Sequence, residues 1–412
     1  MLKIVRKIWQ SINSLTNGKL YLFFRFLVRL TVVPLTYFIW LIEPFKKIRF
    51  HRGQTTRIGH LASYFEVLVR SKEIDITGKK RKEIFIVQKN PPNKTLYNMW
   101  KKHFYFIESN KIDFIYHLCS PWLKNRRHFG PKYVGHAALL PKKPTLKFSQ
   151  KQEMEGRKFS KKIGIHDSDW FVCLHNRSSD YLKRQFVNRD FSQHNIRDCS
   201  FNMLFHSAEF IKKKGGKCIR MSSGEKTKLG KHAPDNIIDY ATKWQTDFMD
   251  IYLPAKCKFF LGSQNGLLNV PQIFNVPVAS TNCIPVNAVS VPRNSFFIPK
   301  MLWLIEEKRF LNYKEITEKK LEKYIHIPKL KSMGIEVIEN DNDDIKLLVE
   351  DIFDHLEGKR ISSKDEKTRD DFMDKYFLEN KFTNKYSKNE KLKYSGKISW
   401  RFLLKHSYLM DV

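Results

Sequence analysis

The chain has 412 residues, 42% of them apolar, so it is long enough for two domains that each bury a core. Its mean hydropathy of −0.46 excludes a polytopic membrane protein. Lysine and arginine number 75 against 42 acidic residues, which gives a net charge of +33. A surplus of this size predicts an anionic partner, but charge alone does not choose between nucleic acid, an anionic membrane and a phosphorylated substrate.

Residues 1–47 differ in composition from the rest of the chain. Residues 20–42 are apolar, but Arg25, Arg29 and Pro34 interrupt them, and the uncharged part, 30–42, is too short for a hydrocarbon core of about 30 Å. Basic residues flank the segment on both sides. We therefore expect a membrane-associating helical segment that lies in the interface and whose arginines reach the headgroups. A spanning helix and a buried core helix are the alternatives.

From residue 48 onward, short apolar β-branched runs alternate with amphipathic stretches, which is the pattern of βαβ units and parallel sheets. The sequence predicts an α/β fold of two Rossmann-like domains, an N-terminal one over 48–160 and a C-terminal one over 161–360, followed by a tail over 361–412. The expected strands are 48–52, 83–88, 170–175, 217–221, 236–240, 258–261 and 276–280. The expected helices are 61–70, 95–104, 201–214, 247–255, 267–274 and 343–356.

Three polar loops each follow a predicted strand, where ligands bind in open α/β sheets. The first contains Arg57, Gly59 and His60 and leads into a helix that carries Glu66. Its glycine permits close backbone approach, and the start of the helix offers free N–H groups. Taken alone, the pattern also fits a tight turn before a capped helix.

The second loop, from His175 to Asp180, places charged residues directly after an apolar strand. Arg177 could hold a diphosphate through two parallel hydrogen bonds, and Asp180 could orient Arg177 or a sugar hydroxyl. A solvated loop with an Arg–Asp ion pair is the alternative.

The third loop runs from Gly262 through Ser263 and Asn265 to Gly266, just before a helix. Small residues and glycines at such a position can cradle an anion, although an ordinary turn between strand and helix has the same composition. It is neither a Walker loop nor a GxGxxG motif. Asp167-Ser168-Asp169 has the Asp-x-Asp spacing of a metal site, but it precedes a strand rather than following one. We therefore expect no metal at the phosphate site.

Together the three loops resemble those of a bacterial family of proposed glycosyltransferases with the two-domain GT-B architecture, and more distantly the fucosyltransferase superfamily. In the fucosyltransferases, a loop with a pattern like His-x-Arg-Arg/Gly-Asp holds the donor diphosphate. His175 and Arg177 match that loop, but the second Arg or Gly is not kept, which argues against GDP-fucose as the donor. The matching segments are 57–70, 171–182, 206–223, 247–282 and 396–406, of which 247–282 is the most specific.

The resemblance also implies where the substrates bind. It places Ser263, Asn265 and Gly266 near the donor phosphates, and Asp250 matches an acidic position of the superfamily. The nucleotide-sugar is expected mainly in the C-terminal domain. The acceptor is expected in the N-terminal one, whose loop contains Arg57.

The implied reaction is a metal-independent, inverting transfer of a sugar to an acceptor hydroxyl, without a cofactor. A general base deprotonates the acceptor while the nucleoside diphosphate leaves. His60 and Glu66 are the candidates for this base from the acceptor side, and Asp180 is the alternative.

We therefore expect a glycosyltransferase of bacterial surface polysaccharide or glycolipid synthesis at the cytoplasmic face of the inner membrane, bound peripherally or monotopically. Its expected partners are a nucleotide-sugar, a lipid-linked or saccharide acceptor and an anionic membrane surface, but no nucleic acid. One alternative is a basic nucleic-acid-binding protein, against which stands the lack of an RNP, KH, zinc or helix-turn-helix signature. The other is a non-catalytic, membrane-bound scaffold of the same fold.

Overall fold

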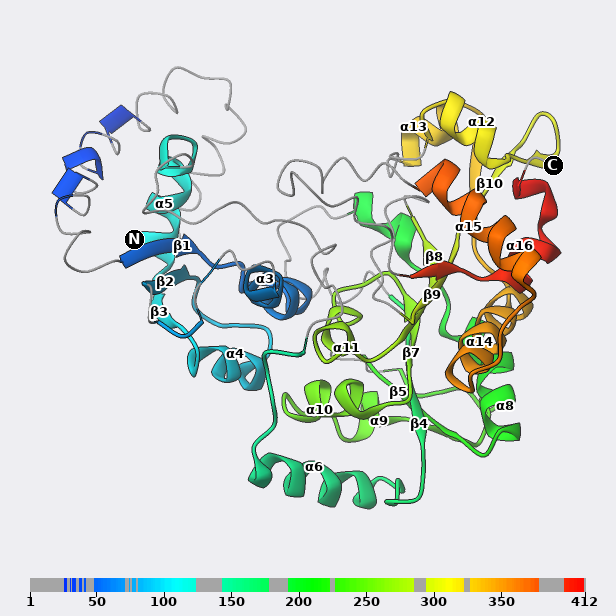
Figure 1. The fold of residues 1–412 in the computed structure, drawn as a ribbon, viewed down its shortest axis with the longest axis horizontal. Helices are drawn as coiled ribbons and strands as arrows, with labels where there is room; N and C mark the ends of the chain where they lie inside the picture. Colours follow the sequence, from blue (N-terminus) through cyan, green and yellow to red (C-terminus); the bar gives the residue numbers. More distant parts are fainter. Residues whose placement is uncertain are drawn as a thin grey trace.

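The computed structural model describes residues 48–123, 143–177, 192–284, 294–377 and 396–410, with gaps at 71–73, 75, 79–80, 223–226 and 322–326, and scattered residues between 26 and 41. Figure 1 shows two α/β units side by side, with helix α6 (Gln150–Lys162) on the connection between them. Each unit contains a parallel sheet, which confirms the predicted α/β class.

The N-terminal unit has a three-stranded parallel sheet in the order β1-β2-β3. The apolar residues of the central strand face the first helix: Phe85 and Val87 are fully buried in one cluster with Phe65. Asn93 caps the second helix by accepting from the Leu96 N–H at 2.8 Å. The elements are β1 (Ile48–Arg52), α3 (Ile58–Arg70), β2 (Lys82–Val87), α4 (Lys94–Lys101), β3 (Tyr105–Glu108) and α5 (Asn110–Leu123).

The C-terminal unit is built on a seven-stranded sheet in the order β13-β9-β8-β7-β4-β5-β6, in which every pair is parallel. Its strands are β4 (Phe171–His175), β5 (Lys217–Arg220), β6 (Ile237–Ile238), β7 (Phe260–Ser263), β8 (Val278–Cys283), β9 (Phe296–Pro299) and β13 (Lys397–Ile398). Its helices are α8 (Phe205–Lys213), α9 (Tyr240–Lys243), α10 (Met249–Lys256), α11 (Asn269–Ile273), α14 (Asn342–Leu356), α15 (Ser363–Phe377) and α16 (Trp400–Lys405). Short 3₁₀ helices are η2 (Ser192–Arg197), η3 (Phe201–Leu204) and η5 (Ser407–Met410).

The connections define where this sheet can bind a ligand. From β4 the chain adds β5 and β6 on one side, and it then returns to place β7 on the other side of β4. The carboxyl ends of β4 and β7 therefore form a topological switch point, where open α/β sheets leave a crevice for ligands.

A small antiparallel sheet, in the order β11-β10-β12, was not predicted. It consists of β10 (Met301–Leu304), β11 (Arg309–Phe310) and β12 (Ile335–Ile338), and it is accompanied by α12 (Tyr313–Glu318) and α13 (Ile327–Ser332). One of its strands has two residues, too few for a period-2 pattern to be seen in the sequence.

The predicted domain limits differ from the structure at two places. The expected tail over 361–412 supplies α15 and α16 to the second unit, and its strand β13 extends the main sheet by pairing with β9. Phe402 and Leu403 are fully buried there. At the other limit, Gly156 of α6 lies so close to Tyr252 of α10 that an added Cβ would overlap the ring. Helix α6 therefore packs on the second unit rather than the first.

Among the described residues, one of the two buried apolar clusters contains residues of both units, whereas the other belongs to the C-terminal unit alone. Leu61 and Phe65 of α3 belong to the same buried cluster as Leu253 of α10 and Leu268, which directly precedes α11. Polar contacts reinforce this interface, since the Asn93 side chain donates to the Asp247 carbonyl at 2.7 Å. Loops of the two units are therefore held in fixed relation to each other.

The N-terminal segment is tested only in small part. Most of residues 20–42 lie outside the described residues, and those that are described include the exposed Phe26, Leu30, Phe38 and Leu41. None of the helices in the described part of the chain combines the length and the apolar character needed to span a bilayer. The interfacial anchor stays a prediction.

Candidate functional site

The second and third predicted loops meet at the switch point of the large sheet. The Arg177 N–H, just past β4, donates to Ser263 Oγ at the end of β7, at 2.8 Å. His175 is paired with Gly262 in the sheet register, and an added Cβ at Gly262 would overlap the His175 carbonyl. This glycine therefore permits the close approach of the two strands at the point where their loops begin.

Three arginines from the two units gather at this point. Burial lowers the pKa of Arg177 to about 10, with the positive charges of Arg197 and Arg57 acting in the same direction. Burial and then Arg57 also lower the pKa of Arg197. Arg57 comes from the loop before α3, whereas the other two belong to the second unit. The three positive charges thus act on one another across the two units, and Asp198 offsets that of Arg177; such a group of arginines is suited to a polyanionic ligand.

Two residues that support Arg177 were missed in the sequence. Asp198 forms an ion pair with Arg177 Nη1, and the Cys199 N–H donates to the Arg177 carbonyl at 3.2 Å. The buried Lys300 reaches the same loop, since its Nζ donates to the Asp198 carbonyl at 3.0 Å. No local signal singles out these positions, because Lys300 is more than a hundred residues away along the chain.

The third loop keeps its shape through its own asparagine. Asn265 Oδ1 accepts the Leu267 N–H at 2.8 Å and the Leu268 N–H at 3.2 Å, so the side chain caps the chain as it turns toward α11. Gly266 then touches the first unit, because an added Cβ at Gly59 would lie 2.7 Å from Gly266 Cα. The predicted acceptor-side and donor-side loops are therefore in backbone contact.

His60 lies in the first turn of α3, next to these loops. Burial, and then the positive charge of Arg57, lower the pKa of His60 below its usual 6.5. The imidazole is therefore neutral near pH 7 and able to accept a proton, as a general base requires.

Glu66 has a different environment from the one a general base needs. It is fully buried, and its Oε1 receives the Arg70 Nε at 2.6 Å and the Thr145 N–H at 2.9 Å. Arg70 in turn donates to the Ile273 carbonyl and to Asn275 Oδ1, each at 2.7 Å. The structure thus places Glu66 in an ion pair within α3, and the arginine of that pair also bonds to the second unit.

Asp250 lies in the first turn of α10 and does not contact the loops of the switch point. Its carboxylate accepts from the Tyr240 hydroxyl and from Gln245 Nε2, both at 3.0 Å. Burial raises the pKa of Asp250 to about 7, although these two hydrogen bonds lower it. Gln245 also donates to the Ser222 carbonyl at 2.7 Å, just past β5. The predicted donor contact of Asp250 is therefore untested, and its described partners belong to the fold.

We expect Asp250→Asn to change how stability depends on pH. The carboxyl titrates near 7 in the folded chain and near 3.8 when unfolded, so the fold favours the protonated form. Stability from this group is complete below about pH 4 and declines as the pH rises toward 7. The variant lacks that decline. Its free energy of unfolding, measured in urea, should therefore be more favourable relative to the wild type at pH 8 than at pH 5. Parallel pH profiles would contradict the buried, titrating carboxyl.

The structure brings together most of the predicted residues. The switch point gathers His175, Arg177, Ser263, Asn265 and Gly266 from the second unit and Arg57, Gly59 and His60 from the first. Asp180 lies outside the described residues, so its role stays a prediction.

A second polar cluster, not predicted, lies at the carboxyl edge of the small parallel sheet. Arg52 ends β1 and donates to Asp113 of α5 through Nε at 2.6 Å and Nη2 at 3.0 Å. Gln88 follows β2 and donates to the same carboxylate at 2.7 Å. The N-terminal unit thus also presents hydrogen-bonding side chains at the edge where its loops emerge.

Comparison with protein-family models and with curated proteins gives no match. Among solved structures, the fold is similar to a family 9 glycosyl transferase from Veillonella parvula, with 9% identity and a TM-score of 0.47 over 75% of this chain and 98% of that one. It is also similar to ADP-heptose LPS heptosyltransferase II of E. coli (11% identity, TM-score 0.34, 57% of this chain, 84% of that one). A third similar structure is E. coli heptosyltransferase WaaC with ADP (10% identity, TM-score 0.33, 70% of this chain, 99% of that one). The solved structures named here are thus glycosyltransferases, at a similarity too low to assign a function. The likeness to fucosyltransferases stays a prediction, and the functional argument rests on the residues of the site.

Proposed function

We propose that this protein is a glycosyltransferase of the GT-B type that transfers a sugar from a nucleoside-diphosphate sugar to an acceptor hydroxyl. The observation that carries the proposal is the convergence of Arg57, Arg177 and Arg197 at the switch point between the two units. Guanidinium groups match phosphate oxygens with two parallel hydrogen bonds. Such a cluster would bind the donor diphosphate and stabilise the charge that develops on it as the sugar leaves.

His60 is the base that the geometry favours. It sits on the acceptor side, its lowered pKa keeps it neutral near pH 7, and Gly59 beside it contacts the donor loop at Gly266. A neutral imidazole in this place could take the proton of the acceptor hydroxyl while the diphosphate departs. Glu66 is less suited because it is already engaged by Arg70.

The acceptor would lie over the N-terminal unit, where Arg52, Gln88 and Asp113 form the polar edge described above. Hydroxyl-rich saccharides are recognised by such hydrogen-bonding groups. A saccharide or lipid-linked acceptor fits this edge, in keeping with a role in surface polysaccharide or glycolipid synthesis.

The decisive experiment is a thermal-unfolding screen with ADP, UDP, GDP, CDP and dTDP and their sugars. A ligand at about 100 times its Kd that binds only the folded chain adds about 2.7 kcal/mol to stability, so a true donor should raise the melting temperature clearly. The sugar nucleotide found in this way is then tested for turnover. The proposal fails if no nucleoside diphosphate binds while RNA does so at physiological salt, since non-specific RNA affinity falls steeply with salt.

We expect activity to withstand EDTA. The proposed phosphate site relies on arginines and backbone N–H groups, and within the described residues no three His, Cys, Asp or Glu side chains cluster so as to hold a metal ion. Turnover should therefore be nearly the same with and without the chelator. Loss of activity that Mg²⁺ or Mn²⁺ restores would contradict this.

We further propose that residues 1–45 hold the enzyme at the cytoplasmic face of the inner membrane. Each basic residue near an anionic surface contributes about 1 kcal/mol, and the apolar part adds a contribution that salt does not screen. Deleting residues 1–45 should release the protein from vesicles containing anionic lipid and leave nucleotide binding intact. Co-sedimentation at low and high salt measures this. Equal binding of the truncated and full chains would contradict the anchor.

A further inference from the structure

A pocket of about 340 Å³ lies in the C-terminal unit, away from the switch point. Phe296 and Lys397, the first residues of β9 and β13, contribute to its wall. All strands of this sheet are parallel, so their amino ends lie at the edge opposite to Arg177 and Ser263, which follow carboxyl ends. The pocket is thus a second site, separate from the proposed nucleotide site.

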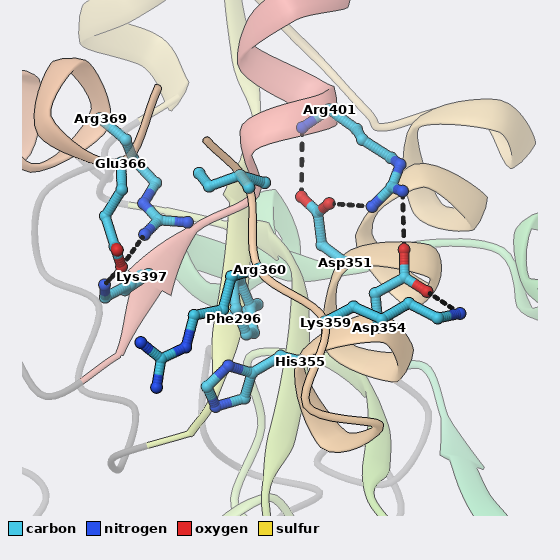
Figure 2. Close-up of a pocket in the computed structure, with 11 residues that line it drawn as sticks. Phe296, Asp351, Asp354, His355, Lys359, Arg360, Glu366, Arg369, Lys397 and Arg401 are labelled. Atoms are coloured by element: carbon cyan, nitrogen blue, oxygen red, sulfur yellow. Dashed lines mark hydrogen bonds and ion pairs between the residues drawn. The ribbon is translucent and has the colours of Figure 1, made fainter. Parts of the chain in front are cut away.

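The wall of the pocket is strongly charged, as Figure 2 shows. It combines five basic side chains, Lys359, Arg360, Arg369, Lys397 and Arg401, with three carboxylates, Asp351, Asp354 and Glu366. Carboxylates just outside the wall also pair with these cations: Glu357 with Lys359 at 2.9 Å, Glu350 with Arg401 at 3.7 Å and Asp370 with Lys397 at 3.7 Å. Its elements are the last turns of α14, the first turns of α15 and α16, and the turn at 359–361.

The carboxylates are already engaged. Arg401 is paired with Asp351 at 2.5 Å and with Asp354 at 2.7 Å, and Lys397 is paired with Glu366 at 2.6 Å. These pairs fix the wall, because their partners come from three different helices and the edge strand.

Arg360 and Arg369 are the cations that remain available. Arg360 is exposed and makes no hydrogen bond or ion pair with another described residue, and its guanidinium lies beside His355 in Figure 2. The Arg369 side chain is only 4% exposed. It donates to Glu366 through Nη2 at 3.2 Å, while its buried Nε has no hydrogen-bond acceptor among the described residues. The nearest carboxylate oxygen to that Nε, on Asp370, is 3.5 Å away, beyond the usual length of a charge-assisted hydrogen bond.

Three cations of the wall act on His355, which lies at the end of α14. Partial burial lowers the pKa of His355, and the charges of Lys397, Arg369 and Arg360 add to this, with Glu366 opposing them. The pKa of His355 therefore responds to a change in the charge at Arg360 or Arg369.

We propose that this pocket binds a phosphate group, carried either by a small soluble phosphate compound or by a lipid headgroup. The forked donors of Arg360 and Arg369 match the oxygens of a phosphate group. A volume of 340 Å³ is at the lower end of the range of about 300–1,000 Å³ for small-molecule sites, so a phosphate with a small organic group fits. An acceptor at Arg369 Nε would complete the hydrogen bonding of this buried guanidinium.

The test is titration of the full chain with inorganic phosphate at constant ionic strength, using the Arg177→Ala background to suppress binding at the switch point. Saturable binding should be weakened about tenfold or more by Arg360→Ala, as expected for loss of a charged hydrogen-bond donor. Lys331→Ala, which removes an exposed lysine of α13 outside the pocket, is the charge-matched control and should leave binding unchanged.

A second readout locates the anion. A bound dianion should raise the pKa of His355, followed by its imidazole proton resonances, and Arg360→Ala should abolish that rise. The proposal is overturned if phosphate binding is not saturable, if Arg360→Ala binds as the wild type does, or if the His355 resonances do not respond.

Two further arms identify the source of the phosphate. Phosphatidylcholine vesicles with and without phosphatidate test the lipid headgroup, and glucose 1-phosphate tests a soluble compound. Weaker vesicle binding by Arg360→Ala than by Lys331→Ala indicates a lipid phosphate. If Arg360→Ala loses glucose 1-phosphate binding but binds vesicles as Lys331→Ala does, the ligand is a soluble phosphate compound. Failure of both arms together with inorganic phosphate overturns the site, and none of these outcomes depends on sugar transfer.

Discussion

Replacing Arg177 by alanine should weaken nucleoside-diphosphate binding by about 10- to 150-fold, which corresponds to about 1.5–3 kcal/mol for a hydrogen bond to a charged group. The Arg177 side chain pairs with Asp198, and its backbone N–H donates to Ser263 Oγ where β4 and β7 meet. Its positive charge acts together with those of Arg57 and Arg197, so its loss removes part of the charge that would hold the diphosphate. Isothermal titration with the diphosphate that gives the largest thermal shift measures the effect.

Two further variants make this result specific. Arg177→Lys keeps the charge but loses the fork, so it should recover only part of the affinity. Arg309→Ala removes an exposed arginine paired with Glu315, far along the chain from the loops, and should bind as the wild type does. Unchanged affinity in a folded Arg177→Ala protein, shown by its circular dichroism, would refute the assignment of the donor site.

Glu66→Gln should destabilise the chain by about 3–5 kcal/mol, the usual cost of removing one partner of a buried ion pair. The Glu66 and Arg70 side chains are 0% and 2% exposed, so the arginine would be left as an uncompensated buried charge. Its other partners, the Ile273 carbonyl and Asn275, lie in the second unit, so the loss weakens the interface between units. Denaturant unfolding measures the difference.

The matched control is Glu350→Gln, which breaks a more exposed ion pair of the same i,i+4 spacing with Lys346 on α14 and a longer contact with Arg401 at 3.7 Å. Exposed pairs contribute about 0–1 kcal/mol, so this variant should be nearly as stable as the wild type. The comparison also separates the two roles considered for Glu66. A general base would lose activity on amide substitution while stability stayed unchanged, and that outcome would restore Glu66 as the base and contradict the structural role.

Local patterns predicted the elements with strong periodicity. Residues 48–52 form β1 with the expected limits, and the helix expected over 343–356 is α14, whose Ile345, Leu348 and Ile352 are fully buried. The loops after β4 and β7 were also located, because polar residues directly after a buried strand stand out in a sequence. For the same reason the sequence singles out Arg177 and Ser263, which the structure joins by a hydrogen bond.

The remaining features depend on contacts that no short window of sequence contains. Strand β13 has two residues and exists because β9 leaves an edge to pair with. Arg197 comes close to Arg177, and Lys300 reaches the Asp198 carbonyl, only after the chain has folded back on itself. Glu66 shows the same limit: a carboxylate near a polar loop suggests chemistry, but its burial against Arg70 is not visible in the neighbouring residues, and its role as a base stays a prediction.

The shared core of the two units also bears on how two substrates would meet. Phe65 of α3 and Leu253 of α10 are both fully buried in it, and wide opening of the units would return such apolar surface to water at about 25 cal/mol per Å². In an enzyme of the proposed kind, donor and acceptor would therefore be held at a separation set by the backbone contact of Gly59 with Gly266. Much of the rate enhancement would then come from preorganised proximity, expressed as a high effective molarity, rather than from closure around the substrates.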